Sequence, residues 1–397
     1  MAPPQQQQRR RRQQLQQEAE ISVHIGEGMD MAALTWGDCA AARRILCVHG
    51  WMDNAGSFGN TECASHAGEA AAADGLGCRL ARDLGAYVVA CDLLGHGHSS
   101  HQPGGFYTNA SWAVQLLKFA DTLGWDDGRQ FTLIGHSMGQ EICSLLAAAF
   151  PERVSDFVML DGCGPWVMPA KWMQHMARQP AKTLRAAAKT WRKRNEYHEK
   201  PRAFASYEDV LGARLSKKFS SAGISRHAAA AITRHGTHTD AHTGKILYTH
   251  DPRVQLTPLE PNGYTEEQAC QLLSEVPRTL AIMARSGIGL TETEAESQDA
   301  ESEEEDSRAD SDEASEDDDD GGAMDSAGDD ISDMEDDDSM VKKFFRRRAP
   351  HFKDLQVVWV QGGHHVHLDT PEPVTRAIVE FLRQETEPAL STPAVKM

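Results

Sequence analysis

Three observations predict an α/β fold with a mostly parallel sheet, helices on both faces and a helical lid insertion. Short apolar runs typical of buried strands alternate with longer runs of helical periodicity after residue 20. A glycine or a glycine-rich loop follows several of the strand-like runs. The length of 397 residues suits one large domain with insertions, or two ordinary domains.

The elements follow one another in a regular order. Residues 21–25 and 31–36 are predicted to form an opening antiparallel hairpin. A helix is expected from residue 109, with Asn109 or Ser111 as its N-cap. The other predicted elements are strands within 43–50, 87–100, 131–137, 156–162, 278–285 and 355–363, and helices at 138–150, 265–276 and 373–384.

The acidity of the chain is concentrated in one segment. The net charge is −19, but residues 291–340 hold 25 acidic residues and a single basic one, Arg308. The rest of the chain is therefore mildly basic. Because the segment has almost no apolar content, it cannot bury enough surface to fold. We expect a disordered loop, for which a basic protein is a candidate partner.

Composition divides the chain into a core, a lid and three disordered segments. The region after residue 163 is basic, contains tryptophans, has helical character and interrupts the core after a strand, as a lid would. The predicted boundaries are 1–19 for a disordered Gln- and Arg-rich tail, 20–163 for the first part of the core, 164–262 for the helical lid, 263–290 for the core continued, 291–340 for the disordered acidic insertion, 341–385 for the C-terminal part of the core and 386–397 for a second tail.

The stretch Gly-His-Ser-Met-Gly at residues 135–139 makes Ser137 the candidate nucleophile. A strand-like run precedes it and a helix-like run follows, which is the context of a G-x-S-x-G nucleophile elbow. The elbow holds its serine in a strained backbone conformation, and side chains at Gly135 or Gly139 would clash. A serine hydroxyl is a poor nucleophile at its own pKa, so it also needs an adjacent base.

Three histidines, His364, His365 and His367, follow the last predicted strand. His364 comes first, directly after two glycines, at the position that the chain order of serine, acid and histidine requires for the base. We therefore assign His364 as general base. Two backbone N–H groups should form the oxyanion hole: that of Met138, after the nucleophile, and that of Trp51, in the loop after the first buried strand.

A resemblance to the α/β-hydrolase superfamily, and more narrowly to the serine hydrolase-like proteins, covers roughly residues 20–285 and 350–385. It rests on the stretches VHGWMDNAGSF, CDLLGHGHS, LIGHSMG, FPERVSDFVMLDGCGPW, DPRVQLTP and GGHHVHLDTPE. The resemblance implies an eight-stranded sheet, a helical lid, no cofactor, and hydrolase activity on an ester-like substrate.

The triad acid departs from the pattern of that superfamily. In most α/β hydrolases it lies just after the strand that is predicted here at 278–285, where this chain has no carboxylate before the acidic insertion. Asp161, after the preceding strand, is our candidate, because it lies at a strand end rather than in a disordered loop. Two alternatives stay open: Glu292 or Glu294 folding back, and a serine–histidine dyad without an acid.

The sequence thus predicts a serine hydrolase of the carboxylesterase type, which cleaves a carboxylic ester or thioester through an acyl-enzyme on Ser137. A carbon–carbon bond hydrolase with the same triad is one alternative. A non-catalytic binding protein on the hydrolase scaffold is the other.

No cofactor or metal is expected, since His96 and His98 lack further ligand spacing, and no nucleic-acid motif is present. No stretch reaches the roughly 18 to 20 apolar residues of a membrane span. The 8 cysteines show no paired spacing, which favours a reducing compartment. We expect a cytoplasmic protein with a small-molecule substrate, with an organelle or the peroxisome left open.

Overall fold

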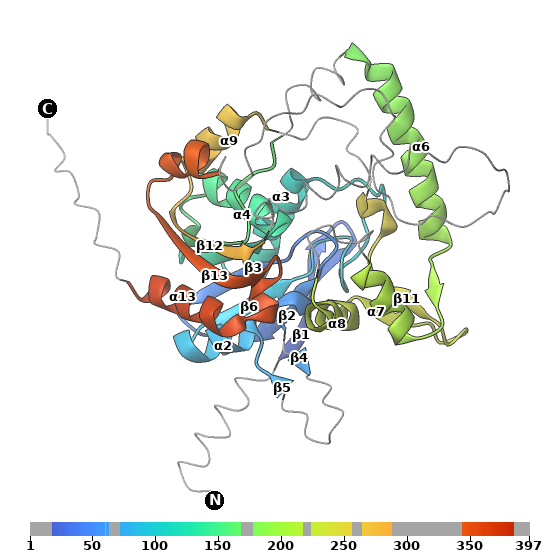
Figure 1. Ribbon diagram of the computed structural model, residues 1–397, viewed down its shortest axis with the longest axis horizontal. Helices are drawn as coiled ribbons and strands as arrows, with labels where there is room; N and C mark the ends of the chain where they lie inside the picture. Colours follow the sequence, from blue (N-terminus) through green and yellow to red (C-terminus); the bar gives the residue numbers. More distant parts are fainter. Residues whose placement is uncertain are drawn as a thin grey trace, which may run out of the picture.

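The computed structural model describes residues 18–59, 61–62, 72–167, 178–216, 224–255, 264–287 and 344–384. Its main strands are β1 (Ala19–Gly26), β2 (Met29–Trp36), β3 (Arg44–Val48), β6 (Tyr87–Cys91), β7 (Phe131–His136), β8 (Val154–Leu160), β12 (Arg278–Ser286) and β13 (Leu355–Gly363). They form one eight-stranded sheet in the order β1-β2-β6-β3-β7-β8-β12-β13 (Figure 1). β1 and β2 are the expected antiparallel hairpin, β2 pairs antiparallel with β6, and the pairs from β6 to β13 are parallel. The predicted fold class is confirmed.

Helices cover both faces of this sheet. The α-helices are α2 (Leu76–Leu84), α3 (Asn109–Thr122), α4 (Met138–Ala149), α6 (Pro180–Glu199), α7 (Tyr207–Leu215), α8 (Arg226–His235), α9 (Glu266–Leu273), α12 (Val366–Asp369) and α13 (Pro371–Arg383). Figure 1 shows α3 and α4 on one face, and α2 and α13 on the other. Because neighbouring strand residues point to opposite faces, Val89 and Leu133 join the core under α3 and α4, whereas Val88 and Ile134 join the core under α2 and α13.

The first turn of α3 corrects one prediction. The N-cap is Thr108, whose hydroxyl accepts the Ser111 N–H at 3.0 Å. The hydrogen bonding is reciprocal, since the Ser111 hydroxyl accepts the Thr108 N–H at 3.1 Å. Asn109 is already the first helical residue. Ser111 therefore completes a capping box from the third helical position rather than starting the helix.

The segment predicted as a helical lid is not purely helical. Besides α6, α7 and α8, its described residues contain an antiparallel sheet in the order β10-β11-β9, formed by β10 (Thr237–Thr239), β11 (Ile246–Tyr248) and β9 (Ala203–Phe204). α8 packs against the 3-10 turn η1 (Ala55–Phe58), which follows β3, and against α12, which follows β13. The segment thus meets the core where parallel strands end.

Shorter elements complete the described chain: β4 (Thr61–Glu62), β5 (Ala72–Ala73), the 3-10 turns η2 (Pro252–Gln255) and η5 (Ala349–His351), and a π-helical turn, η4 (Phe344–Arg348). Every described cysteine is a free thiol. Among the described residues, no helix is long and apolar enough to cross a membrane. The acidic insertion, the C-terminal tail and nearly all of the N-terminal tail lie outside the described residues, so these predictions stay predictions.

Candidate active site

Ser137 lies at a sharp turn between β7 and α4, with φ 48° and ψ −122°. L-residues rarely adopt this backbone conformation. The flanking glycines are needed because the backbone approaches closely: a Cβ on Gly135 would lie 2.4 Å from the Gln140 Cα, and one on Gly139 would lie 2.2 Å from the Val48 carbonyl oxygen. The turn therefore has the geometry that the G-x-S-x-G motif predicts.

His364 follows β13 and lies directly against Asp161. The His364 Nδ1 is 2.7 Å from the Asp161 Oδ2, and both side chains are buried. A carboxylate only accepts hydrogen bonds, so Nδ1 carries the hydrogen. In the neutral ring, Nε2 then keeps a free lone pair, as a general base requires.

Asp161 reaches this position from the end of β8, with φ 45°. Its Oδ1 accepts the Ala284 N–H of β12 at 3.0 Å. A Cβ on Gly287, directly after β12, would lie 2.3 Å from the Asp161 carboxylate oxygens. The absence of a side chain at Gly287 thus leaves the space beside His364 to a carboxylate from the neighbouring strand.

The environment of His364 keeps its ring neutral. Burial is the main cause that lowers its pKa to about 4; the hydrogen bond to Asp161 opposes this shift, and the His136 and His365 rings add to it. At neutral pH the ring is therefore unprotonated and able to accept a proton. An unprotonated imidazole has the lone pair that a general base needs.

His136 links the nucleophile turn to the histidine loop. Its Nε2 donates to the His364 carbonyl oxygen at 2.9 Å, and the two ring centroids are 4.6 Å apart. Among the described contacts, no hydrogen bond joins the Ser137 hydroxyl to the His364 ring. Catalytic contacts are often long without substrate and tighten in the substrate complex.

The two predicted oxyanion donors lie on neighbouring loops. Met138 is the first residue of α4, where N–H groups have no intrahelical acceptor. Trp51 lies in the turn after β3, with its side chain exposed. The close approach of Gly139 to the Val48 carbonyl brings these loops together, and a Cβ on Gly50 would lie 3.2 Å from the Ser137 Cβ.

A buried charge network supports both loops. Asp53, after the Trp51 turn, pairs with Arg214 of α7, and its Oδ2 lies 3.2 Å from the His365 Nε2 and 3.5 Å from the His136 Nδ1. Burial raises the pKa of Asp53, but His365, His136 and Arg214 outweigh that effect and hold its pKa well below the usual range. The ionised Asp53 thus joins the nucleophile turn, the histidine loop and α7.

Sequence reasoning missed Arg214, whose Nη1 also donates to the Met52 carbonyl oxygen at 2.7 Å. It also missed His235 of α8, whose Nε2 lies 2.8 Å from the Asp92 Oδ2 after β6. Asp92 in turn accepts the Ala55 N–H at 2.7 Å. No sequence pattern marks these long-range partners, because each depends on how the inserted segment packs on the core.

Two groups of described residues have the donors and spacing to hold a metal ion. One is Asp53, His136 and His365, in the network just described. The other is His101, His198 and Asp251, which lie outside the candidate active site.

Comparison with known proteins agrees with the fold. The family model described as alpha/beta hydrolase fold matches residues 43–226. A serine hydrolase-like protein of Danio rerio is 25% identical over 359 residues, covering 90% of this chain and 86% of that protein. A serine hydrolase-like protein of Dictyostelium discoideum is 36% identical over 148 residues, covering 36% of this chain and 35% of the relative. The chain therefore matches only about a third of the length of the Dictyostelium relative.

Solved structures show the same architecture. A hypothetical protein of Pseudomonas aeruginosa PAO1 superposes with a TM-score of 0.61 at 23% identity, covering 92% of this chain and 99% of that one. The thioesterase domain from the curacin biosynthetic pathway gives a TM-score of 0.60 at 16% identity, with coverage of 92% and 99%. Similarity at these identities shows the fold alone.

Sheet order, elbow and family model together show that the chain has the α/β-hydrolase fold. Among curated proteins, the chain is similar to serine hydrolase-like proteins. Fold and relatives support a hydrolase.

Proposed function

We propose that this protein is a serine hydrolase that cleaves a carboxylic ester or thioester through an acyl-enzyme on Ser137. The observation that carries the proposal is the 2.7 Å contact between His364 and Asp161, beside the strained turn of Ser137. Nucleophile, base and acid then come from three neighbouring places at one edge of the sheet: the ends of β7, β13 and β8.

In the proposed reaction, the His364 Nε2 takes the proton of the Ser137 hydroxyl as the oxygen attacks the substrate carbonyl carbon. The N–H groups of Met138 and Trp51 stabilise the oxyanion of the tetrahedral intermediate. The protonated His364, stabilised by Asp161, then gives its proton to the leaving alcohol or thiol. Water, activated by His364, releases the acid and restores Ser137.

The inserted segment would act as a lid over this site. Supporting this, α8 packs against the loops after β3 and β13, and α7 contributes Arg214 to the network around Asp53. Both contacts connect the segment to loops that we assign to catalysis.

Labelling with a fluorophosphonate probe tests the proposal. The wild-type protein should be labelled, and Ser137→Ala and His364→Ala should each abolish labelling. Matched controls are Ser155→Ala, on β8, and His227→Ala, on the exposed side of α8; both should label normally. Folded wild-type protein that takes up no probe would instead favour a binding protein on the hydrolase scaffold. Labelling that persists in Ser137→Ala would place the nucleophile elsewhere.

Acyl substrates would then separate the substrate classes. Hydrolysis of p-nitrophenyl esters and of S-acyl thioesters should show burst kinetics, because the acyl-enzyme accumulates when its hydrolysis is slow. A wild-type protein that reacts with the probe but cleaves neither class would refute the proposed substrate and leave the nucleophile intact.

A further inference from the structure

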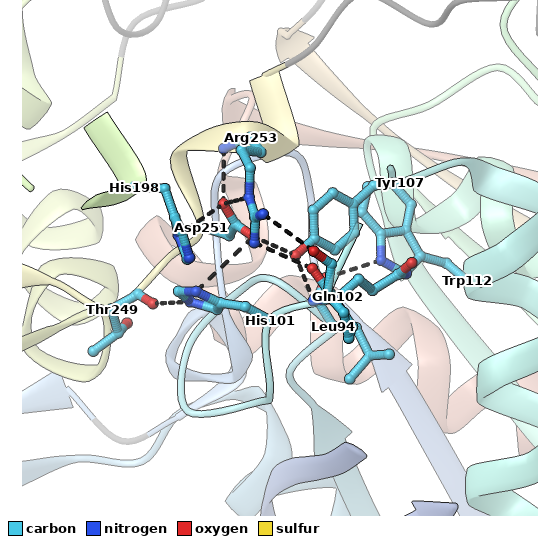
Figure 2. Close-up of polar contacts among 10 residues, drawn as sticks. Leu94, His101, Gln102, Tyr107, Trp112, His198, Thr249, Asp251 and Arg253 are labelled. Atoms are coloured by element: carbon cyan, nitrogen blue, oxygen red, sulfur yellow. Dashed lines mark hydrogen bonds and ion pairs between the residues drawn. The ribbon is translucent and has the colours of Figure 1, made fainter. Parts of the chain in front are cut away.

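Three side chains from three segments meet between α6 and the core (Figure 2). His101 lies in the loop after β6, His198 in the last turn of α6, and Asp251 directly before η2. The His198 Nδ1 is 3.5 Å from the Asp251 Oδ1, and the His101 Nδ1 is 3.9 Å from the Asp251 Oδ2. One donor atom from each residue lies within 4.8 Å of the other two.

These distances are close to those of a metal site. With bonds of about 2.0–2.1 Å to nitrogen and oxygen, the ligand atoms of a tetrahedral zinc site lie about 3.4 Å apart. Small rotations of the two histidine rings would bring their nitrogens within that spacing. The donor set of two imidazoles and one carboxylate suits zinc and similar transition metals, whereas calcium and magnesium prefer oxygen ligands.

A hydrogen bond to the backbone fixes the tautomer of His101. The His101 Nε2 contacts the Thr249 carbonyl oxygen at 2.8 Å, and a carbonyl only accepts, so Nε2 carries the hydrogen. In the neutral ring, the Nδ1 lone pair is then available on the side of Asp251. A backbone carbonyl on the second nitrogen commonly fixes the tautomer of a metal-binding histidine.

Both oxygens of the Asp251 carboxylate also accept hydrogen bonds from neighbouring groups. The Arg253 backbone N–H and Nε donate to its Oδ1, each at 2.9 Å. The Tyr107 hydroxyl donates to its Oδ2 at 2.7 Å, and the Arg253 Nη2 donates to the same oxygen at 2.8 Å (Figure 2). The carboxylate is therefore fixed in orientation. The Arg253 guanidinium already neutralises part of the Asp251 charge. We therefore expect the metal to bind more weakly than at a closed structural zinc site, and a chelator to remove it readily.

The cluster of His101, His198 and Asp251 is open to solvent, whereas the group of Asp53, His136 and His365 is buried. The side chains of His101 and His198 are each 32% exposed, so an ion can enter and water can complete its coordination. The group around Asp53 is buried, and a Cβ on Gly50 would lie 2.9 Å from the His136 Nδ1. The Gly50 backbone thus leaves little room for an ion there.

We propose that His101, His198 and Asp251 bind one zinc ion, or a similar divalent transition metal, with water as a further ligand. The ion would join the C-terminal turn of α6 to the loop after β6, and so fasten part of the inserted segment to the core.

Zinc titration of the full-length, metal-stripped protein by isothermal calorimetry tests the proposal. We expect one site in the wild type, and at least a tenfold loss of affinity in His101→Asn/His198→Asn. The matched control, His227→Asn/His242→Asn, also removes two histidines, both exposed and outside the cluster, and should bind as the wild type does. Wild-type protein that binds no zinc, or a cluster variant with unchanged affinity and stoichiometry, would refute the site.

Two further measurements distinguish a loss of zinc binding from a folding defect in the variants. Without metal, all variants should melt at the wild-type temperature; if the double variant does not, the single change His198→Asn, at the partly exposed end of α6, replaces it. With zinc, backbone amides of the last turn of α6 should exchange hydrogen more slowly in the wild type and the control only. Equal slowing in the cluster variant would contradict the proposal.

Discussion

The exchange Asp161→Asn tests the assignment of the acid most directly, because the structure determines how the new amide would lie. The Asp161 Oδ1 accepts the Ala284 N–H, so the amide oxygen should take that position. The amide nitrogen then replaces Oδ2, facing the His364 Nδ1. As a donor, it would bind His364 in the tautomer with hydrogen on Nε2, which cannot accept the serine proton.

The expected loss is large. A triad whose acid becomes an amide keeps its geometry but holds the wrong tautomer, and the turnover rate falls about 10,000-fold. At 1.36 kcal/mol for each tenfold change, this corresponds to about 5 kcal/mol of transition-state stabilisation. The alternatives predict a small effect, since a dyad or an acid at Glu292 or Glu294 would not involve Asp161.

The assay is the rate of fluorophosphonate labelling, together with ester turnover where a substrate is found. Asp127→Asn is the matched control, because it removes a carboxylate outside the site, where Asp127 pairs with the buried Arg44 and the exposed Arg129; its rate should be that of the wild type. Melting temperatures establish that both variants fold. Asp161→Asn protein that is folded and labels within a few-fold of the wild-type rate would show that Asp161 is not the acid.

Three further predictions concern pH and stability. Labelling should be constant near neutral pH and fall as pH drops through about 4, where His364 takes up a proton; a midpoint near 6.5 would contradict the effect of burial. Burial raises the pKa of Glu141 from 4.5 to about 7, so the folded state holds this proton more tightly and loses stability as pH rises from about 4.5 to 7. Glu141→Gln should therefore be more stable than the wild type by about 3 kcal/mol at pH 8, and equal urea midpoints at pH 8 would oppose this. Arg214→Met removes the guanidinium partner of the buried Asp53 and should cost about 3–5 kcal/mol in urea unfolding, whereas Arg226→Met, in an exposed pair with Glu208, should change little. Similar costs for the two variants would contradict the network.

Local sequence patterns predicted those residues of the site that directly follow a strand. The glycines around Ser137 are required by contacts within one strand–turn–helix unit, so the motif predicts the turn. His364 follows the last strand, and Asp161 follows the strand next to the nucleophile strand. Parallel strands end at the same edge of a sheet, so these positions alone predict that Ser137, His364 and Asp161 lie close together.

The parts that the sequence did not predict depend on contacts between distant segments. Arg214 and His235 reach the core loops from α7 and α8, and His101 and His198 meet although 97 residues separate their numbers. Neither periodicity nor spacing encodes how an insertion packs on a sheet. The strands of the β10-β11-β9 sheet have two or three residues each, too few for an alternating pattern to be recognised.

The position of Asp161 on β8 has a consequence for the connection between β12 and β13. With the acid that we propose supplied by β8, the proposed reaction needs no group from the connection between Gly287 and β13, since His364 follows β13. That connection returns the chain so that β13 pairs parallel with β12, and its described end packs Phe344 and Phe352 into the core. Selection on catalysis would therefore tolerate gains and losses of sequence there, and it is in this connection that the chain carries its acidic residues 291–340.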